Sequence, residues 1–282
     1  MNIVEQYEFD RTGYIVLRDF LSPAEVKTLA EAADRLEEHA LPRAALPPRK
    51  RSHVTKGDND WHWEAERGYH AMTRPVRDGG DQEGQTLIVE DFINFDPAFD
   101  FLVDHAPTME YVRSIVQGPI RINNTELRVR YTGNASRPHN GAPLDHKYRY
   151  SFNADGIDAM MSRMVYFLHD VSNEEGAFSL VPGSHKSNIP SPYEKGEEPG
   201  MIGIEVKAGD ALLFTESLLH GGFTNQSPRP RKTLHVGYGP YWMYSQNTAT
   251  RDEPQVILPE TLARYTDAQK ALFRIPGAAP VG

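Results

Sequence analysis

Short apolar runs separated by turn signals fill the chain between residues 127 and 238, and this pattern limits the possible folds most strongly. Apolar residues alternate with polar or small ones over residues 127–131 and 202–206, as expected of half-buried strands. Further strands are predicted at 164–168, 177–181, 211–214 and 233–238, with Gly-containing turns before several of them. Short strands at this spacing predict a mainly β domain, either a sandwich or a jelly roll.

Helical signals gather before and after this region. Ser22, Pro23 and Glu25 form a capping-box pattern, which predicts a helix over about 23–38. Other helices are expected near 107–116 and 259–273. Because no linker divides the sequence, we expect one domain over 1–282. It would comprise a helical flank and lid (1–118), a jelly-roll core (119–240) and a C-terminal extension (241–282).

Residues 41–68 combine prolines, basic residues and tryptophans. They predict either a solvated loop pinned to the core by its tryptophans or a lid over an active site. In the second interpretation Trp61 contacts the substrate.

Composition excludes several classes of protein. The chain has 282 residues and a net charge of −9, which argues against a general nucleic-acid binder. With no cysteine, a metal would need ligands from Asp, Glu or the eleven histidines. No apolar run reaches transmembrane length, and the acidic start of the chain is unlike a signal peptide, so we expect no membrane partner and a cytoplasmic location. Either a monomer or a homodimer is compatible with this sequence.

His220 and Arg231 are the first candidate site residues. The strand over 211–214 would deliver His220 to a rim, and the next strand would begin near Arg231 and include Thr233. Imidazole binds metals, and guanidinium binds carboxylates in bidentate pairs. With the two groups side by side, a dicarboxylate that chelates a metal at His220 would be clamped by Arg231. A metal-binding histidine beside a carboxylate-binding arginine is the basic arrangement of a non-haem iron site that uses 2-oxoglutarate.

Several ordered motifs resemble the phytanoyl-CoA hydroxylase-like dioxygenase family. They are the segments 9–14 and 21–26, the Gly-Ala-Phe-Ser-Leu-Val-Pro-Gly-Ser-His-Lys stretch at 176–186, and the segment 209–220 followed by Arg231. Together they cover about residues 8–238. The resemblance implies a double-stranded β-helix that binds Fe(II), 2-oxoglutarate and O2. It also implies that His220 is the distal iron ligand, that Arg231 binds 2-oxoglutarate and that His185 is structural.

The family's upstream His-x-Asp pair is altered in this chain. His139 suits the first iron ligand, but Gly141 stands at the carboxylate position. In one account a displaced carboxylate, Asp145 or Glu216, completes the iron site. In a second account the vacancy at Gly141 admits chloride, as in the halogenases of this superfamily, and in a third the site has decayed to a metabolite-binding jelly roll.

The expected function is C–H hydroxylation of a small molecule, with succinate and CO2 as coproducts, and halogenation is the main alternative. We expect His139, His220 and Asp145 at the metal, and Arg231, Thr233 and Arg130 at the cosubstrate. Of the neighbours Arg128 and Arg130, one is expected to face solvent. His146 and Tyr148, together with Trp61, would contact a substrate that basic residues at 49–51 suggest is anionic. A zinc hydrolase is the remaining possibility, but it leaves Arg231 unexplained.

Overall fold

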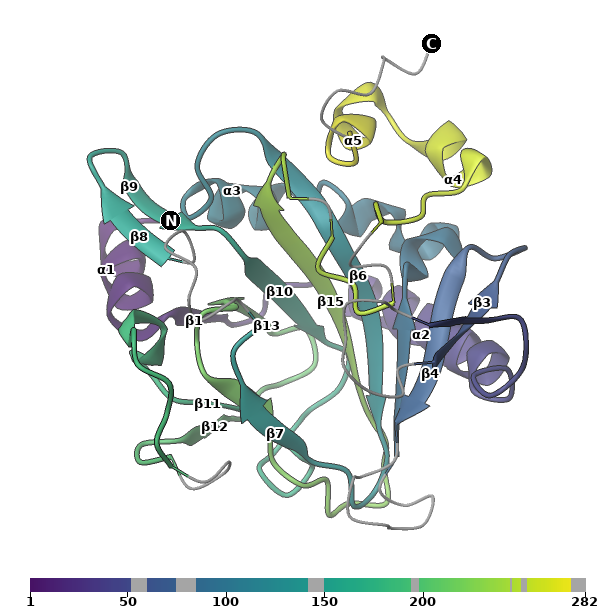
Figure 1. Ribbon diagram of the computed structural model, residues 1–282, viewed down its shortest axis with the longest axis horizontal. Helices are drawn as coiled ribbons and strands as arrows, with labels where there is room; N and C mark the ends of the chain where they lie inside the picture. The colour runs from purple at the N-terminus through teal and green to yellow at the C-terminus, as the bar shows by residue number, and fades with distance from the viewer. Residues whose placement is uncertain are drawn as a thin grey trace.

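The computed structural model describes residues 1–51, 60–74, 85–141, 150–193, 198–243, 245–249 and 253–274. Two antiparallel sheets dominate it (Figure 1). The major sheet has the strand order β1-β13-β10-β15-β6-β5-β4-β3-β2, the minor sheet has the order β12-β11-β14-β7, and β8 and β9 form a separate hairpin. This is the predicted jelly roll, a double-stranded β-helix.

The strands of the major sheet are β1 (Tyr14–Leu17), β2 (Arg49–Arg51), β3 (Asp60–Glu64), β4 (Tyr69–Arg74), β5 (Thr86–Glu90), β6 (Ile120–Arg130), β10 (Ser162–Phe167), β13 (Ala211–Thr215) and β15 (Arg231–Pro240). Those of the minor sheet are β7 (Ser136–His139), β11 (Phe178–Leu180), β12 (Ile202–Ile204) and β14 (His220–Gly222). The hairpin consists of β8 (Tyr150–Asn153) and β9 (Gly156–Ala159).

The helices are α1 (Ile3–Thr12), α2 (Pro23–Ala40), α3 (Ala106–Arg113), α4 (Pro259–Arg264) and α5 (Asp267–Ala271), with short 3-10 turns η2 (Phe92–Asn94), η3 (Pro97–Leu102) and η4 (Ser184–Lys186). The predicted capping box at Ser22 and Glu25 is present and begins α2. The predicted C-terminal helix is instead two short ones, because Tyr265 is extended and Thr266 starts a new capping box. Within the described ranges, no helix combines the length and apolarity needed to cross a membrane.

The long strands β6 and β15 lie side by side at the centre of the major sheet, with Arg130 opposite Arg231 (Figure 1). One face of β6, including Leu127 and Val129, packs in the main core together with buried residues of α2 and α3. Because side chains alternate along a strand, the even-numbered residues from 126 to 130 lie on the opposite face. A second apolar cluster joins β10 and β13 to β11 and β12, and so ties the two sheets together.

The described part of 41–68 forms turns and bends at 41–48 and 65–68, as expected of a loop, but it also contains two strands that the sequence did not predict. Strands β2 and β3, followed by β4 and β5, extend the major sheet by antiparallel pairing. Trp61 is fully buried in a small cluster with Met72, Ile88 and Ala249. Residues 1–118 are therefore a mixture of helices and sheet strands and not a helical flank.

Candidate active site

The minor sheet brings His139 and His220 together. Strand β7 pairs with β14 so that the two histidines are direct partners, and their ring centroids are 4.5 Å apart. The Nδ1 of His220 lies 2.8 Å from the Leu218 carbonyl, and the Nδ1 of His139 lies 2.9 Å from the Arg137 carbonyl. A carbonyl only accepts, so Nδ1 carries the proton in both rings and Nε2 keeps its lone pair.

Both imidazoles are held in the neutral form that ligates metals. Burial lowers the pKa of His220, whose ring is packed between Phe178 and Phe214. Burial of the ring, followed by the effect of neighbouring His220, lowers the pKa of His139 to about 3, although the residue stands at a solvent-exposed rim. The pair offers two Nε2 lone pairs to a common ion.

Glu216 lies in the turn between β13 and β14 and adds a buried carboxylate to this pair. Its Oε2 is 3.7 Å from His220 Nε2, and its Oε1 forms an ion pair with Arg163 Nε on β10. Burial alone would raise the pKa of Glu216, but Arg163, followed by His220 and His139, outweighs it and lowers that pKa. The carboxylate is therefore charged. In the described part of the chain, no three acidic or histidine side chains already stand at metal-binding spacing.

Gly141 is in direct contact with Glu216. Its backbone N–H donates to the Glu216 carbonyl at 2.9 Å, and a Cβ at position 141 would lie 1.6 Å from Glu216 Oε2. The space that an aspartate would need at this position is thus occupied. Asp145, the predicted third ligand, lies outside the described residues.

Buried arginines gather on the inner face of the major sheet. Arg128 and Arg130 on β6 point to the same side because they are two residues apart in a strand, so the expectation that one of them faces solvent is wrong. Arg231 is buried opposite Arg130, and its Nη1 donates to the Gly176 carbonyl at 2.8 Å. Burial, followed by repulsion from Arg128, lowers the pKa of Arg231 to about 9.

Arg130 and Arg231 each have a buried Nε with no hydrogen-bond partner, and among the described residues no carboxylate forms an ion pair with either. Thr233 Oγ1 lies next along the same face of β15, 2.9 Å from His235 Nε2. His220 and Arg231 lie on different sheets and not side by side, but the two sheets meet here. The Arg130 guanidinium carbon is 3.5 Å from where a Cβ on Gly222 of β14 would stand. Unpaired buried guanidiniums of this kind suit an anionic ligand.

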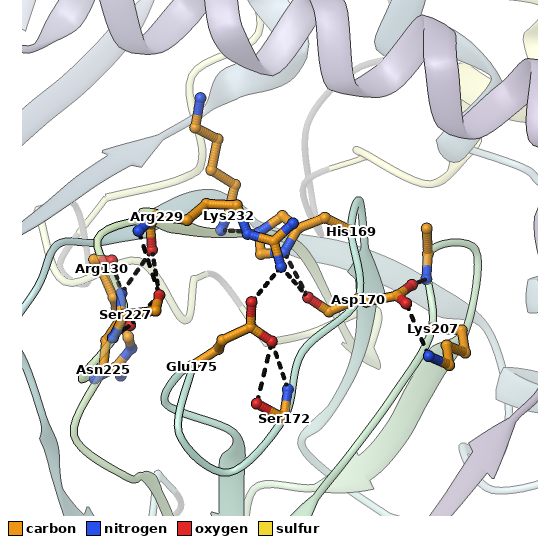
Figure 2. Close-up of polar contacts among 11 residues, drawn as sticks. Arg130, His169, Asp170, Ser172, Glu175, Lys207, Asn225, Ser227, Arg229 and Lys232 are labelled. Atoms are coloured by element: carbon orange, nitrogen blue, oxygen red, sulfur yellow. Dashed lines mark hydrogen bonds and ion pairs between the residues drawn. The ribbon is translucent and has the colours of Figure 1, made fainter.

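The loop between β14 and β15 sets the position of Arg231 relative to His220, and Figure 2 shows how it is fixed. The Asn225 amide donates to the Arg130 carbonyl at 3.1 Å and to the Arg229 carbonyl at 2.9 Å, and its oxygen accepts from Ser227. Arg229 forms an ion pair with Glu175 at the loop's outer side. Sequence reasoning missed Asn225, although Asn side chains often fix turns by accepting the backbone N–H two residues on, as the Asn225 oxygen does from Ser227.

Residues 9–233 match the family model of phytanoyl-CoA dioxygenase (PhyH). The chain belongs to the PhyH dioxygenase family. The dioxygenase olcK of Penicillium canescens is 35% identical over 77 residues, which is 27% of this chain and 25% of olcK, so this match spans only a quarter of that relative. A probable alpha-ketoglutarate-dependent hypophosphite dioxygenase of Stutzerimonas stutzeri is 23% identical over 83% of this chain and 77% of its own.

Among solved structures, HygX from Streptomyces hygroscopicus with nickel, 2-oxoglutarate and hygromycin B bound shares the fold. Its TM-score is 0.66 at 20% identity, over 91% of this chain and 96% of HygX. His139, His220 and Arg231 all lie within the range that matches the PhyH model.

Some of the remaining predicted residues of this PhyH dioxygenase lie in the described part of the chain, and others do not. Trp61 lies on the inner side of the sheet extension, and its buried Nε1 has no hydrogen-bond partner. His185, which was expected to be structural, is buried with its Nε2 3.1 Å from the Asp10 carbonyl. His146 and Tyr148 lie outside the described residues. The basic cluster at 49–51 is partly neutralised, because Arg49 pairs with Asp60 and Lys50 pairs with Glu253.

Proposed function

We propose that this dioxygenase uses Fe(II), 2-oxoglutarate and O2 to hydroxylate a C–H bond of a small molecule. One oxygen atom of O2 ends in succinate and the other in the new hydroxyl group, with CO2 as the further product. The observation that carries the proposal is the pairing of two site halves. The minor sheet presents two neutral histidines whose Nε2 atoms keep their lone pairs, and the major sheet presents buried guanidiniums that have no carboxylate partner among the described residues.

His139 and His220 would hold the metal, because their Nδ1 hydrogen bonds to backbone carbonyls leave Nε2 as the ligand atom. When bound, the iron supplies the oxidising chemistry that breaks the C–H bond. Arg231 would bind a carboxylate of 2-oxoglutarate and orient it, with Arg130 adding a second positive charge. Burial of these guanidiniums excludes water and so strengthens the ion pair.

Two kinds of likeness support the proposal. The Stutzerimonas relative is named as dependent on alpha-ketoglutarate, and HygX has been solved with nickel, 2-oxoglutarate and a small-molecule antibiotic bound. Both fit a small-molecule oxygenase. Halogenation, the alternative that Gly141 suggests, depends on what fills the space beside that residue, and the geometry of Glu216 bears on it directly.

The test is anaerobic binding of 2-oxoglutarate to the Fe(II)-loaded protein, followed by succinate formation in air across a panel of small molecules. We expect His220→Ala to abolish both metal binding and turnover, and Arg231→Ala to abolish cosubstrate binding. Arg229→Ala is the matched control, because Arg229 lies two residues away but is exposed and paired with Glu175. Equal cosubstrate affinity in Arg231→Ala, or ligand binding that is indifferent to iron and gives no succinate, would contradict the proposal and favour a binding protein.

A further inference from the structure

The carboxylate of Glu216 stands in the space that the glycine at position 141 leaves open. A Cβ at 141 would lie 1.6 Å from Glu216 Oε2 and 2.6 Å from its carboxyl carbon, which no real side chain tolerates. The backbone does not require glycine there, since the positive-φ glycines of the described chain do not include Gly141. Space alone therefore explains this glycine, and the atom that fills the space is a carboxylate oxygen.

The turn that carries Glu216 is fixed on both sides. Its backbone N–H donates to the Met161 carbonyl at 2.9 Å, and its carbonyl accepts from the Gly141 N–H. The side chain is 3% exposed and directs Oε2 toward His220 Nε2 at 3.7 Å. Cis ligands at about 2.1 Å from one metal lie about 3 Å apart, so the two atoms need to approach by less than about 1 Å.

Arg163 holds the other oxygen of Glu216 and does not depend on it for neutralisation. Its Nη1 also donates to Asn124 Oδ1 at 2.7 Å and lies 3.4 Å from Glu126 Oε2. A carboxylate with one oxygen fixed by a cation and the other aimed at a histidine is the arrangement that metal sites use to orient a monodentate ligand.

We propose that Glu216 is the carboxylate ligand of the metal held by His139 and His220, and that Gly141 is present to make room for it. This inference rests on the proposed function. It identifies the displaced carboxylate as Glu216 and not Asp145, and it fills the space in which a halide would bind. An anionic third ligand favours delivery of hydroxyl and not of halogen to the substrate.

The test is the affinity of the full-length protein for Mn(II), measured by calorimetry and by the EPR signal of the bound ion without any substrate. Glu216→Ala and Glu216→Gln are expected to lose at least about tenfold in affinity. Glu90→Gln, which alters another fully buried carboxylate, is the matched control and is expected to keep the wild-type affinity. Thermal unfolding without metal shows that each variant is folded, and Glu216→Gln retains the volume of the side chain if the alanine variant does not fold.

Gly141→Ala separates this proposal from a halide vacancy. With Glu216 present, the added methyl group must displace Oε2, so we expect a similar loss of Mn(II) affinity. In a protein that already carries Glu216→Ala, Gly141→Ala is expected to cause no further loss of Mn(II) affinity. In the same Glu216→Ala protein, Gly141→Asp is expected to restore Mn(II) binding. Unchanged affinity in both Glu216→Ala and Gly141→Ala would overturn the inference and leave the proposed function intact. Failure of the wild type to bind Mn(II) would instead overturn the proposed function itself.

Discussion

Replacing Arg231 by methionine should stabilise the protein without cosubstrate while abolishing cosubstrate binding. Arg231 is 1% exposed and has no ion-pair partner among the described residues. Burial, followed by repulsion from Arg128, lowers its pKa from 12.5 to about 9, which corresponds to about 5 kcal/mol of unfavourable free energy for the charged form. Arg231→Met removes this unfavourable free energy, but it also loses the hydrogen bond to the Gly176 carbonyl, which offsets roughly 2–3 kcal/mol of the gain in stability.

The net expectation for Arg231→Met is a gain of about 2–3 kcal/mol, or a rise in melting temperature of roughly 4–12 °C. The assay is thermal unfolding of the Mn(II)-loaded protein with and without 2-oxoglutarate. A hundredfold excess of ligand over its dissociation constant should stabilise the wild type by about 2.7 kcal/mol and leave the variant unchanged.

Arg163→Met is the matched control, for which we expect a loss of stability and not a gain. Arg163 is similarly enclosed but is paired with Glu216 and Glu126, and these carboxylates help to raise its pKa despite burial. Removing it should destabilise the protein by about 3–5 kcal/mol, because the buried carboxylate of Glu216 loses its cationic partner and Glu126 keeps only Arg128. If Arg231→Met instead lowers stability by more than about 1 kcal/mol, the charge of Arg231 is compensated within the protein, and the reasoning fails.

Three further outcomes are expected. Burial, followed by Glu126, raises the pKa of Glu90 to about 8, so the folded protein holds a proton that the unfolded chain releases near pH 4.5. The contribution of Glu90 to stability therefore falls as pH rises from about 4.5 to about 8. Urea unfolding at several pH values should show that Glu90→Gln removes this pH dependence of the unfolding free energy, and the same pH dependence in wild type and variant would contradict the prediction. Asn225→Ala should cost roughly 2–4 kcal/mol in the same assay and weaken 2-oxoglutarate binding, whereas Ser227→Ala should cost about 1 kcal/mol. Asp210→Ala should cost about 2–4 kcal/mol of unfolding free energy, because the Asp210 carboxylate accepts hydrogen bonds from the Asp19 and Lys207 backbone N–H groups and from Arg18. It should leave 2-oxoglutarate affinity unchanged, and a change in that affinity would show that the turn at Asp210 influences the site.

Local patterns in the sequence predicted the elements whose determinants are local. The capping box at Ser22 gave α2, and period-two alternation gave most strands of the core. The same alternation, applied to Arg128 and Arg130, would have placed both on one face. Strands β2 to β5 were missed, β2 and β3 because prolines, basic residues and tryptophans in 41–68 resemble a loop. Only their successive antiparallel pairing reveals them as part of the sheet.

The arrangement around Gly141 depended on contacts between distant segments. Sequence reasoning named Glu216 as one of two displaced carboxylates, but it placed Asp145, six residues after His139, at the metal. Only the pairing of β7 with β14 shows that Glu216 already abuts position 141. Proximity in the sequence does not reveal this contact, because strands that are distant along the chain meet in the minor sheet.

The charges between the sheets divide the interior into two functional ends. Glu126 and Glu216 neutralise Arg163 close to the histidines, whereas Arg130 at the end of β6 and Arg231 at the start of β15 have no carboxylate partner among the described residues. A buried charge without a partner is costly, so this second end is complete only when an anion occupies it. If the proposed function and the assignment of Glu216 hold, metal affinity and cosubstrate affinity depend on different residues. Changes at Glu216 should act on the metal first, and changes at Arg231 should act on the cosubstrate while the metal remains bound.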